Sequence, residues 1–368
     1  MHNDELLYAV ALTKIDKVGA VTAKNLISYC GSPQAVLKEK KQHLLRIPQI
    51  GEGIAQAIQD PTIFSKAEEE LRFTEQEQIQ VIYYQDALYP TRLKNYQDSP
   101  LILYYKGTSD LNQEKIIAVV GTRKVTEYGK KLIQQLIDGI RDLNVLVVSG
   151  LAYGVDSLAH KKCVEEHIET IGILGHGLDR MYPEVNTQLA KQMQRHGGVL
   201  TEFGMNTKPD RENFPKRNRI VAGMSDAVLV IETLREGGSM ITASYANQYN
   251  KDVFAFPGKT SDVYSSGCNF LIKNHQAQLI ESAEDLILNM RWDVAAKSPK
   301  GIQQSLFVEL DASEKQLIEI LQNNNAVSID YFYQNTEFSP SQLASVLLNL
   351  EFKGLVQLEP GKKYSLVN

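Results

Sequence analysis

From about residue 115 onward, short apolar runs alternate with longer amphipathic stretches. The runs are rich in Val and Ile, and they cover residues 116–120, 145–149, 171–174, 227–231 and 253–256. Strands that alternate with helices predict a mostly parallel sheet with helices on both faces. Two earlier runs, 81–84 and 101–105, are expected to add strands at one edge. The pattern therefore predicts an α/β fold with a Rossmann-like core over residues 73–290.

Residues 1–72 show short helical periodicities, polar turns and no strand-like alternation, so they predict a small helical domain. Segments 15–19 and 47–53 resemble the turns of helix-hairpin-helix (SAM-like) domains, where glycine lets backbone N–H groups approach a phosphate. However, Lys17 and Gln49 stand where small turn residues are usual, and nine basic residues face nine acidic ones. We expect this domain to serve in packing rather than in DNA contact.

The end of the chain predicts a winged-helix domain. A polar stretch with Pro and Gly, 291–305, has the composition of a linker. Residues 306–368 then predict helices at 313–323 and 329–335, a third helix capped by Ser339, and a hairpin of 355–358 with 364–367. The third helix has no cation before Lys353, and the domain has four Lys against eight acidic residues. We therefore expect a protein-contact or structural role instead of duplex reading.

Composition narrows the class of protein. The 368 residues are 43% hydrophobic. Cys30, Cys163 and Cys268 are far apart in the sequence and odd in number, so they predict neither a CxxC metal site nor a disulfide framework. The chain shows neither a basic and apolar leader nor a run that would span a bilayer, so we expect a cytoplasmic protein without metal, cofactor or membrane partner. The net charge of -5 means that any nucleic-acid site must be a local basic patch.

Four glycine-rich loops follow predicted strands, at 120–124, 149–156, 175–179 and 236–242. Open α/β sheets bind ligands outside the carboxyl ends of their strands, where such loops aim backbone N–H groups and helix N-termini at an anion. One loop is weak evidence, but several at one sheet edge predict a phosphate-binding surface. The candidate residues in these loops are Arg123, Lys124, Gly150, Gly238 and Ser239.

The sharpest local feature is the segment 208–219, with five cations, two acids and one aromatic ring. Single-stranded nucleic acid needs cations for its backbone and ring faces for its splayed bases. The candidate DNA contacts here are Arg211, Phe214, Lys216, Arg217 and Arg219. Alternatively, some arginines pair with nearby acids or buried carbonyls and Phe214 belongs to the core. We expect Asn218 and at least one of Arg217 and Arg219 to fix the loop in this way.

Five motifs, in this order and spacing, closely resemble the DprA/Smf family: SGLAYGVDSLAH, GHGLDRMYP, TEFGMNTKPDRENFPKRNRIVAGMSDAVLVIE, GGSMITASYA and VFAFPG. The resemblance covers about residues 80 to 280. It implies a homodimer, not an enzyme, that binds and protects incoming single-stranded DNA and helps load the RecA recombinase in natural transformation. By motif position it implies DNA contacts at Arg123, Arg211 and Phe214 and at the backbone around Gly150 and Gly238.

Three alternative functions belong to other classes of protein: an oxidoreductase, a hydrolase and a scaffold. A nucleotide-dependent oxidoreductase needs GxGxxG after the first strand, where this chain has only Gly121. A phosphoribohydrolase of the lysine-decarboxylase-like type needs a glutamate that the stretch 236–244 lacks, and His160 and His176 are expected to serve in packing and in a turn. Release of free base from nucleoside monophosphates would distinguish this hydrolase from a binder. A pure scaffold would have no DNA affinity.

Overall fold

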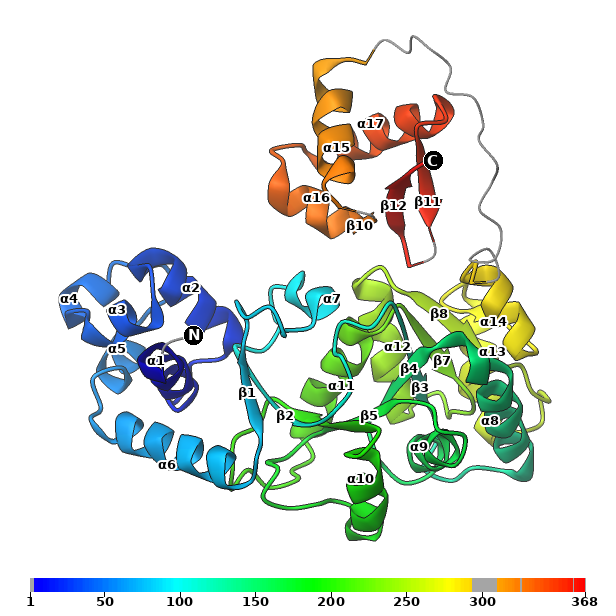
Figure 1. Cartoon of the computed structure of the whole chain (residues 1–368), viewed down its shortest axis with the longest axis horizontal. Coiled ribbons are helices and arrows are strands. Elements are labelled where there is room, and N and C mark those ends of the chain that lie inside the picture. Colours follow the sequence, from blue (N-terminus) through cyan, green and yellow to red (C-terminus); the bar gives the residue numbers. More distant parts are fainter. Residues whose placement is uncertain (1–2, 293–309, 325, 360, 368) are drawn as a thin grey trace.

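The computed structural model describes residues 3–292, 310–324, 326–359 and 361–367. Beyond Trp292, the predicted linker 291–305 lies outside the described residues. Figure 1 shows a group of helices at the start of the chain, a large sheet flanked by helices, and a small domain at the end of the chain. In the described part of the chain, none of the helices combines the length and the apolar character needed to span a membrane.

The central sheet has nine strands in the order β1-β2-β6-β5-β4-β3-β7-β8-β9. Neighbours from β6 to β9 pair in parallel, whereas β1 and β2 pair antiparallel at one edge, which confirms the predicted mostly parallel core. The strands are β1 Gln80–Tyr83, β2 Ile102–Gly107, β3 Lys115–Val120, β4 Val145–Ser149, β5 Thr170–Leu174, β6 Gly197–Thr201, β7 Ala227–Val230, β8 Asp252–Ala255 and β9 Gln278–Leu279.

The sequence analysis did not find β6, which joins the parallel part of the sheet to β2. The strand begins with Gly197 and Gly198, and glycine weakens a strand in general. Here both glycines are needed, because a Cβ at Gly197 would overlap the carbonyl of Thr170 and one at Gly198 would overlap the ring of Tyr105. Strand propensity therefore fails to predict β6, because the close packing of neighbouring backbones requires glycines that a strand otherwise disfavours.

Helices cover both faces of the sheet. Along β3, Ile116, Ala118 and Val120 belong to one core, and Ile117 and Val119 to the other. Packed against the first core are α7 Thr91–Lys94, α11 Asn213–Met224, α12 Gly238–Gln248 and α13 Ser266–Lys273. The second core is covered by α8 Glu127–Ile140, α9 Val155–Glu165 and α14 Ala283–Asn289, while α10 Thr187–Met193 packs near β5 and β6. Short 3-10 helices lie at Arg141–Leu143, Glu184–Asn186 and Val263–Ser265.

The helical module at the start of the chain packs on the antiparallel edge of the sheet. Its helices are α1 Asn3–Thr13, α2 Ala20–Cys30, α3 Pro33–Lys38, α4 Lys41–Leu44, α5 Glu52–Ala57 and α6 Thr62–Gln76. The predicted hairpin turns hold Lys17 and Gln49 at φ 66 and 67, the left-handed region that small residues usually occupy. Its core includes Tyr83 and Ile102 of the edge strands. Residue 72, the predicted domain boundary, lies inside α6.

The end of the chain has the predicted winged-helix fold. Its elements are α15 Ala312–Gln322, β10 Val327–Ser328, α16 Ile329–Asn335, α17 Pro340–Phe352, β11 Val356–Glu359 and β12 Lys363–Leu366. The strands form a sheet in the order β10-β12-β11, and Ser339 caps α17 by accepting a hydrogen bond from the Gln342 N–H. Leu317, Phe332 and Leu343 lie in a core of the domain's own residues. The predicted wing is therefore confirmed.

Asp226, just before β7, ties three parts of the chain together. Its buried carboxylate accepts two hydrogen bonds from the Arg92 guanidinium, both at 2.8 Å, and one from the Ile116 N–H at 3.0 Å. The ammonium of Lys363, in the winged-helix domain, donates a further bond at 2.8 Å. Burial by itself would raise the pKa of Asp226, but Arg92 and Lys363 outweigh burial and hold this pKa well below its usual range.

We expect Asp226→Asn to lower the free energy of unfolding by about 3–5 kcal/mol at pH 7, because it leaves the Arg92 side chain, which is only 10% exposed, without its anion. The folded-state pKa of Asp226 is depressed, so its stabilisation is complete above the unfolded pKa near 4 and is lost as pH falls below it. The difference between wild type and variant should therefore shrink between about pH 5 and pH 2.

Urea unfolding followed by the fluorescence of Trp292 measures this difference, because Trp292 is the single tryptophan and packs against the sheet core. Asp142→Asn, at an exposed position, is the matched control and should unfold like wild type. A difference between wild type and Asp226→Asn that stays the same at pH 7 and pH 3 would contradict the ion-pair account.

Candidate nucleic-acid interface

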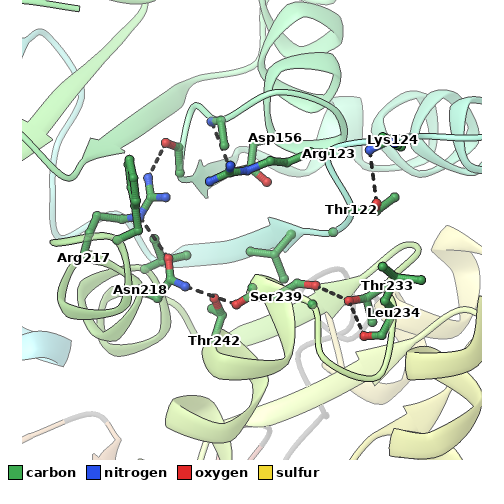
Figure 2. A pocket seen from close by; sticks show the side chains of 18 of the residues that line it. Thr122, Arg123, Lys124, Asp156, Arg217, Asn218, Thr233, Leu234, Ser239 and Thr242 are labelled. Carbon is green, nitrogen blue, oxygen red and sulfur yellow. Dashed lines mark hydrogen bonds between the residues drawn. The ribbon is translucent and has the colours of Figure 1, made fainter. Parts of the chain in front are cut away.

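A cavity of about 450 Å³ opens at the carboxyl ends of β3, β4 and β7. Figure 2 shows residues of the loop after β3, of α11 and of α12 around it. Three of the four predicted glycine-rich loops contribute to its wall. Of the predicted contact residues, those that line it are Arg123, Lys124, Gly150, Phe214, Arg217, Gly238 and Ser239, whereas Arg211, Lys216 and Arg219 are not part of the lining.

The loop after β3 is fixed by Glu232, a residue that the sequence analysis did not single out. The Thr122 N–H donates to the Glu232 carbonyl at 2.6 Å. The buried Glu232 carboxylate also accepts hydrogen bonds from the Thr126 N–H at 2.9 Å and from the Thr126 hydroxyl at 2.5 Å. Arg123 and Lys124 are therefore presented from a braced loop. The sequence feature that could have identified Glu232 is its position directly after the predicted buried strand 227–231.

The loop after β4 lies against the loop after β3, backbone on backbone. Gly154 has φ +84, and a Cβ there would overlap the carbonyl oxygen of Thr122. The Val155 N–H donates to that same carbonyl at 3.1 Å. The position requires glycine because of both its conformation and this close approach. The two loops consequently act as one wall of the cavity.

Arg217 of α11 also lines the cavity and is only 5% exposed. Its guanidinium donates hydrogen bonds to the carbonyls of Gly150 and Ile173, and its Nε donates to the Asn218 side chain at 3.0 Å. A Cβ on Gly150 would overlap this guanidinium, so Gly150 is needed to admit it. Burial lowers the pKa of Arg217 to about 10, with Asp156 opposing the shift, so Arg217 stays charged at neutral pH.

Arg219 is likewise turned inward, since it forms a partly buried ion pair with Glu202. The Asn218 amide donates to the Gly238 carbonyl at 3.2 Å and joins α11 to α12. Arg217, Asn218 and Arg219 therefore all make contacts within the protein that fix the loop. This agrees with the alternative interpretation of the segment, in which these side chains serve the loop and not the DNA. The contacts of these side chains are with protein acceptors, although Nη1 of Arg219 has no hydrogen-bond partner within the described residues. A direct DNA contact by either arginine stays a prediction.

Four other predicted cations face solvent: Arg123, Lys124, Arg211 and Lys216. Within the described ranges, no hydrogen bond or ion pair is made by any of these four side chains. The Arg123 guanidinium lies 5.7 Å from the ring centre of Phe214, which is half-buried. The segment 208–219 thus splits into inward arginines that hold its shape and outward cations that are available to an anion.

The first turn of α12 closes the other side of the cavity. Gly238 is exposed with open space beside its Cα, and the Ser239 hydroxyl donates to the Thr233 hydroxyl at 2.6 Å. The first N–H groups of a helix have no partner within the helix, and its dipole favours negative charge there. Exposed cations on one wall and this helix end on the other make the cavity suited to phosphate groups.

The titratable groups near the cavity are held in structural contacts. Burial raises the pKa of Asp156, while the neighbouring Arg217 opposes the shift. His160 is fully buried, its Nδ1 lies 2.6 Å from the Thr170 hydroxyl, and burial lowers its pKa to about 3. His176 is also buried and donates to the Gly177 carbonyl at 2.9 Å. Among the described residues no cluster of His, Cys, Asp or Glu could hold a metal ion.

Comparisons with known proteins agree with this architecture. The family model for DNA recombination-mediator protein A matches residues 80–291. Models for the DprA winged helix domain and for a SAM-like helix-hairpin-helix tandem match residues 307–362 and 9–60. The chain is 29% identical to Protein Smf of Synechocystis over 99% of each chain.

Two solved structures share the fold. One is the X-ray structure of DNA processing protein A from Streptococcus pneumoniae, with TM-score 0.64 and 29% identity over 77% of this chain and 97% of that chain. The other, from Helicobacter pylori, was described for its unique single-stranded DNA binding mode and has TM-score 0.54 and 28% identity over 59% of this chain and 97% of that chain. The domain order, the motifs and a family match over more than half of its length show that this chain belongs to the DprA/Smf family of DNA-processing proteins in recombination.

Proposed function

We propose that the chain binds single-stranded DNA at the cavity, with phosphates held by Arg123, Lys124 and the first turn of α12. Arg211 and Lys216 add charge beside it, and Phe214 offers a ring to a base. The observation that carries the proposal is the pairing of a helix N-terminus with exposed cations that make no hydrogen bond or ion pair within the described residues, at the ligand-binding end of the sheet. The single-stranded DNA binding described for the Helicobacter pylori relative supports it.

Within this proposal, Arg217, Arg219 and Gly150 serve DNA binding by holding the wall in shape, and Ser239 does so through Thr233. The protein would act without catalysis, as a cytoplasmic homodimer that protects incoming single strands and helps load RecA in natural transformation. The match to a recombination-mediator family supports this cellular role. The fixed, buried state of His160 and His176 supports a binder over a hydrolase.

Binding to a short oligonucleotide should weaken as salt rises, because cations on the protein displace counterions from the strand. With three or four phosphates neutralised, the slope of log K against log salt should be about -2 to -3, at roughly -0.7 per contact. Arg211→Ala should weaken binding and flatten the slope by about 0.7, with little change in melting temperature because Arg211 is exposed. Mobility-shift titrations with single and double strands test this. A slope near zero, or a preference for the duplex, would overturn the proposed site.

Phe214→Ala removes a ring and no charge. If the ring stacks on a base, affinity should fall by about 1–3 kcal/mol while the salt slope stays that of wild type. Because Phe214 is half-buried, the loss in stability should stay below the roughly 3–5 kcal/mol of a fully buried Phe. Titration and thermal melting of the same preparation separate the two effects. A large fall in melting temperature, with affinity kept in the folded fraction, would make Phe214 a core residue only.

Truncation after about residue 300 should leave oligonucleotide affinity nearly unchanged. The winged-helix domain contacts the sheet at the opposite ends of the strands. There Lys363 pairs with Asp226, just before β7, and the Gly361 N–H donates to Asp252, the first residue of β8. The domain has four Lys against eight acidic residues, so its removal takes away net negative charge. Titration of the truncated and full chains at one salt concentration measures this. Loss of most binding would place the site elsewhere.

A further inference from the structure

Two exposed tyrosine rings stand beside the cavity. A small hollow adjoins it and is lined by Tyr153, Tyr182, Phe214 and Arg123. Tyr153 is 47% exposed and Tyr182 is 42% exposed, although large aromatic side chains are mostly buried in folded proteins. The Tyr182 ring centre lies 6.1 Å from that of Phe214. The hollow therefore continues the cavity with aromatic surface.

Both tyrosines are carried on backbone that is held in place. Tyr153 directly precedes Gly154, whose close approach to Thr122 sets this loop against the loop that bears Arg123. The Tyr182 N–H donates to Nε2 of the buried His176 at 3.2 Å. The rings are thus presented in fixed positions, and within the described part of the chain neither hydroxyl makes a hydrogen bond.

Phe214 alone offers limited surface to a base. It is half-buried, the guanidinium carbons of Arg123 and Arg217 lie 5.7 and 6.0 Å from its ring centre, and one ring edge faces Gly175. The two tyrosines are the more open rings of the hollow. Rings with nearly half of their surface exposed, next to an exposed cation without a hydrogen bond or ion pair, match what a splayed single strand requires.

We propose that Tyr153 and Tyr182 stack on successive bases of a single strand whose phosphates lie at the cavity. This inference rests on the proposed function and adds a base-contacting surface to a site otherwise built for phosphates. Stacking on π faces tolerates any base, so the ligand is single-stranded nucleic acid without strong sequence preference. The same surface disfavours a duplex, in which the base faces are covered by their neighbours.

The test compares wild type with Tyr153→Leu, Tyr182→Leu and the double variant, using a short oligothymidylate and an abasic oligonucleotide of equal length. Leucine keeps an apolar side chain and removes the π face. Affinity for oligothymidylate should fall about 5- to 100-fold for each ring, with an unchanged salt slope, while affinity for the abasic strand stays that of wild type. Tyr182→Phe, which keeps the ring, should bind like wild type.

Tyr29→Leu is the matched control, because Tyr29 is 59% exposed on α2 in the helical module. Thermal melting of each variant verifies folding. Equal affinity of wild type and the leucine variants for oligothymidylate, or an equal loss on the abasic strand, would overturn the stacking role and leave the proposed function intact. Failure of wild type to bind either oligonucleotide would instead overturn the proposed function.

Discussion

The buried guanidinium of Arg217 is the interaction on which the candidate site depends. A charge in the interior is costly unless its donors find acceptors. This guanidinium donates to the carbonyl of Gly150, directly after β4, and to that of Ile173, the second-last residue of β5. It therefore pins α11 to the carboxyl edge of the sheet. Gly150 permits the approach because a Cβ there would occupy the guanidinium's place. Together with the bond from Asn218 to the Gly238 carbonyl and the Arg219–Glu202 pair, this anchor holds the C-terminal part of the segment 208–219 in place.

The charged and polar groups have different roles at the two ends of the parallel strands. At the carboxyl edge, loops and helix ends leave N–H groups and cations free for a ligand, which is the general property of such sheets. At the amino ends of the strands, Arg92 and Lys363 both form ion pairs with Asp226, so these two cations are engaged within the protein. The winged-helix domain contacts this amino edge. An acidic domain at that place leaves the field of the ligand edge undisturbed.

The chain has a net charge of -5 but still has a local cationic surface, because some of its cations point into the protein and others point to solvent. Arg217 and Arg219 point inward and are bonded to carbonyls and to Glu202, so they shape the wall without adding to the external surface. Arg123 and Arg211 are exposed, and in the described part of the chain neither makes a side-chain hydrogen bond or an ion pair. Local attraction to phosphate is thus compatible with an acidic protein, because screening confines charge effects to about 10 Å.

The pattern of apolar and polar residues was enough to predict seven strands, both flanking domains and the loops at the carboxyl ends of the strands. It was enough because a buried strand or helix face needs apolar residues at a regular spacing along the chain. Only the tertiary structure revealed β6, whose glycines serve neighbouring backbones, and the bracing by Glu232 of a loop distant in sequence. It also decided that Arg217 lies inward and Arg211 outward. Both arginines look alike in sequence, and what separates them is the position of carbonyls more than forty residues away along the chain.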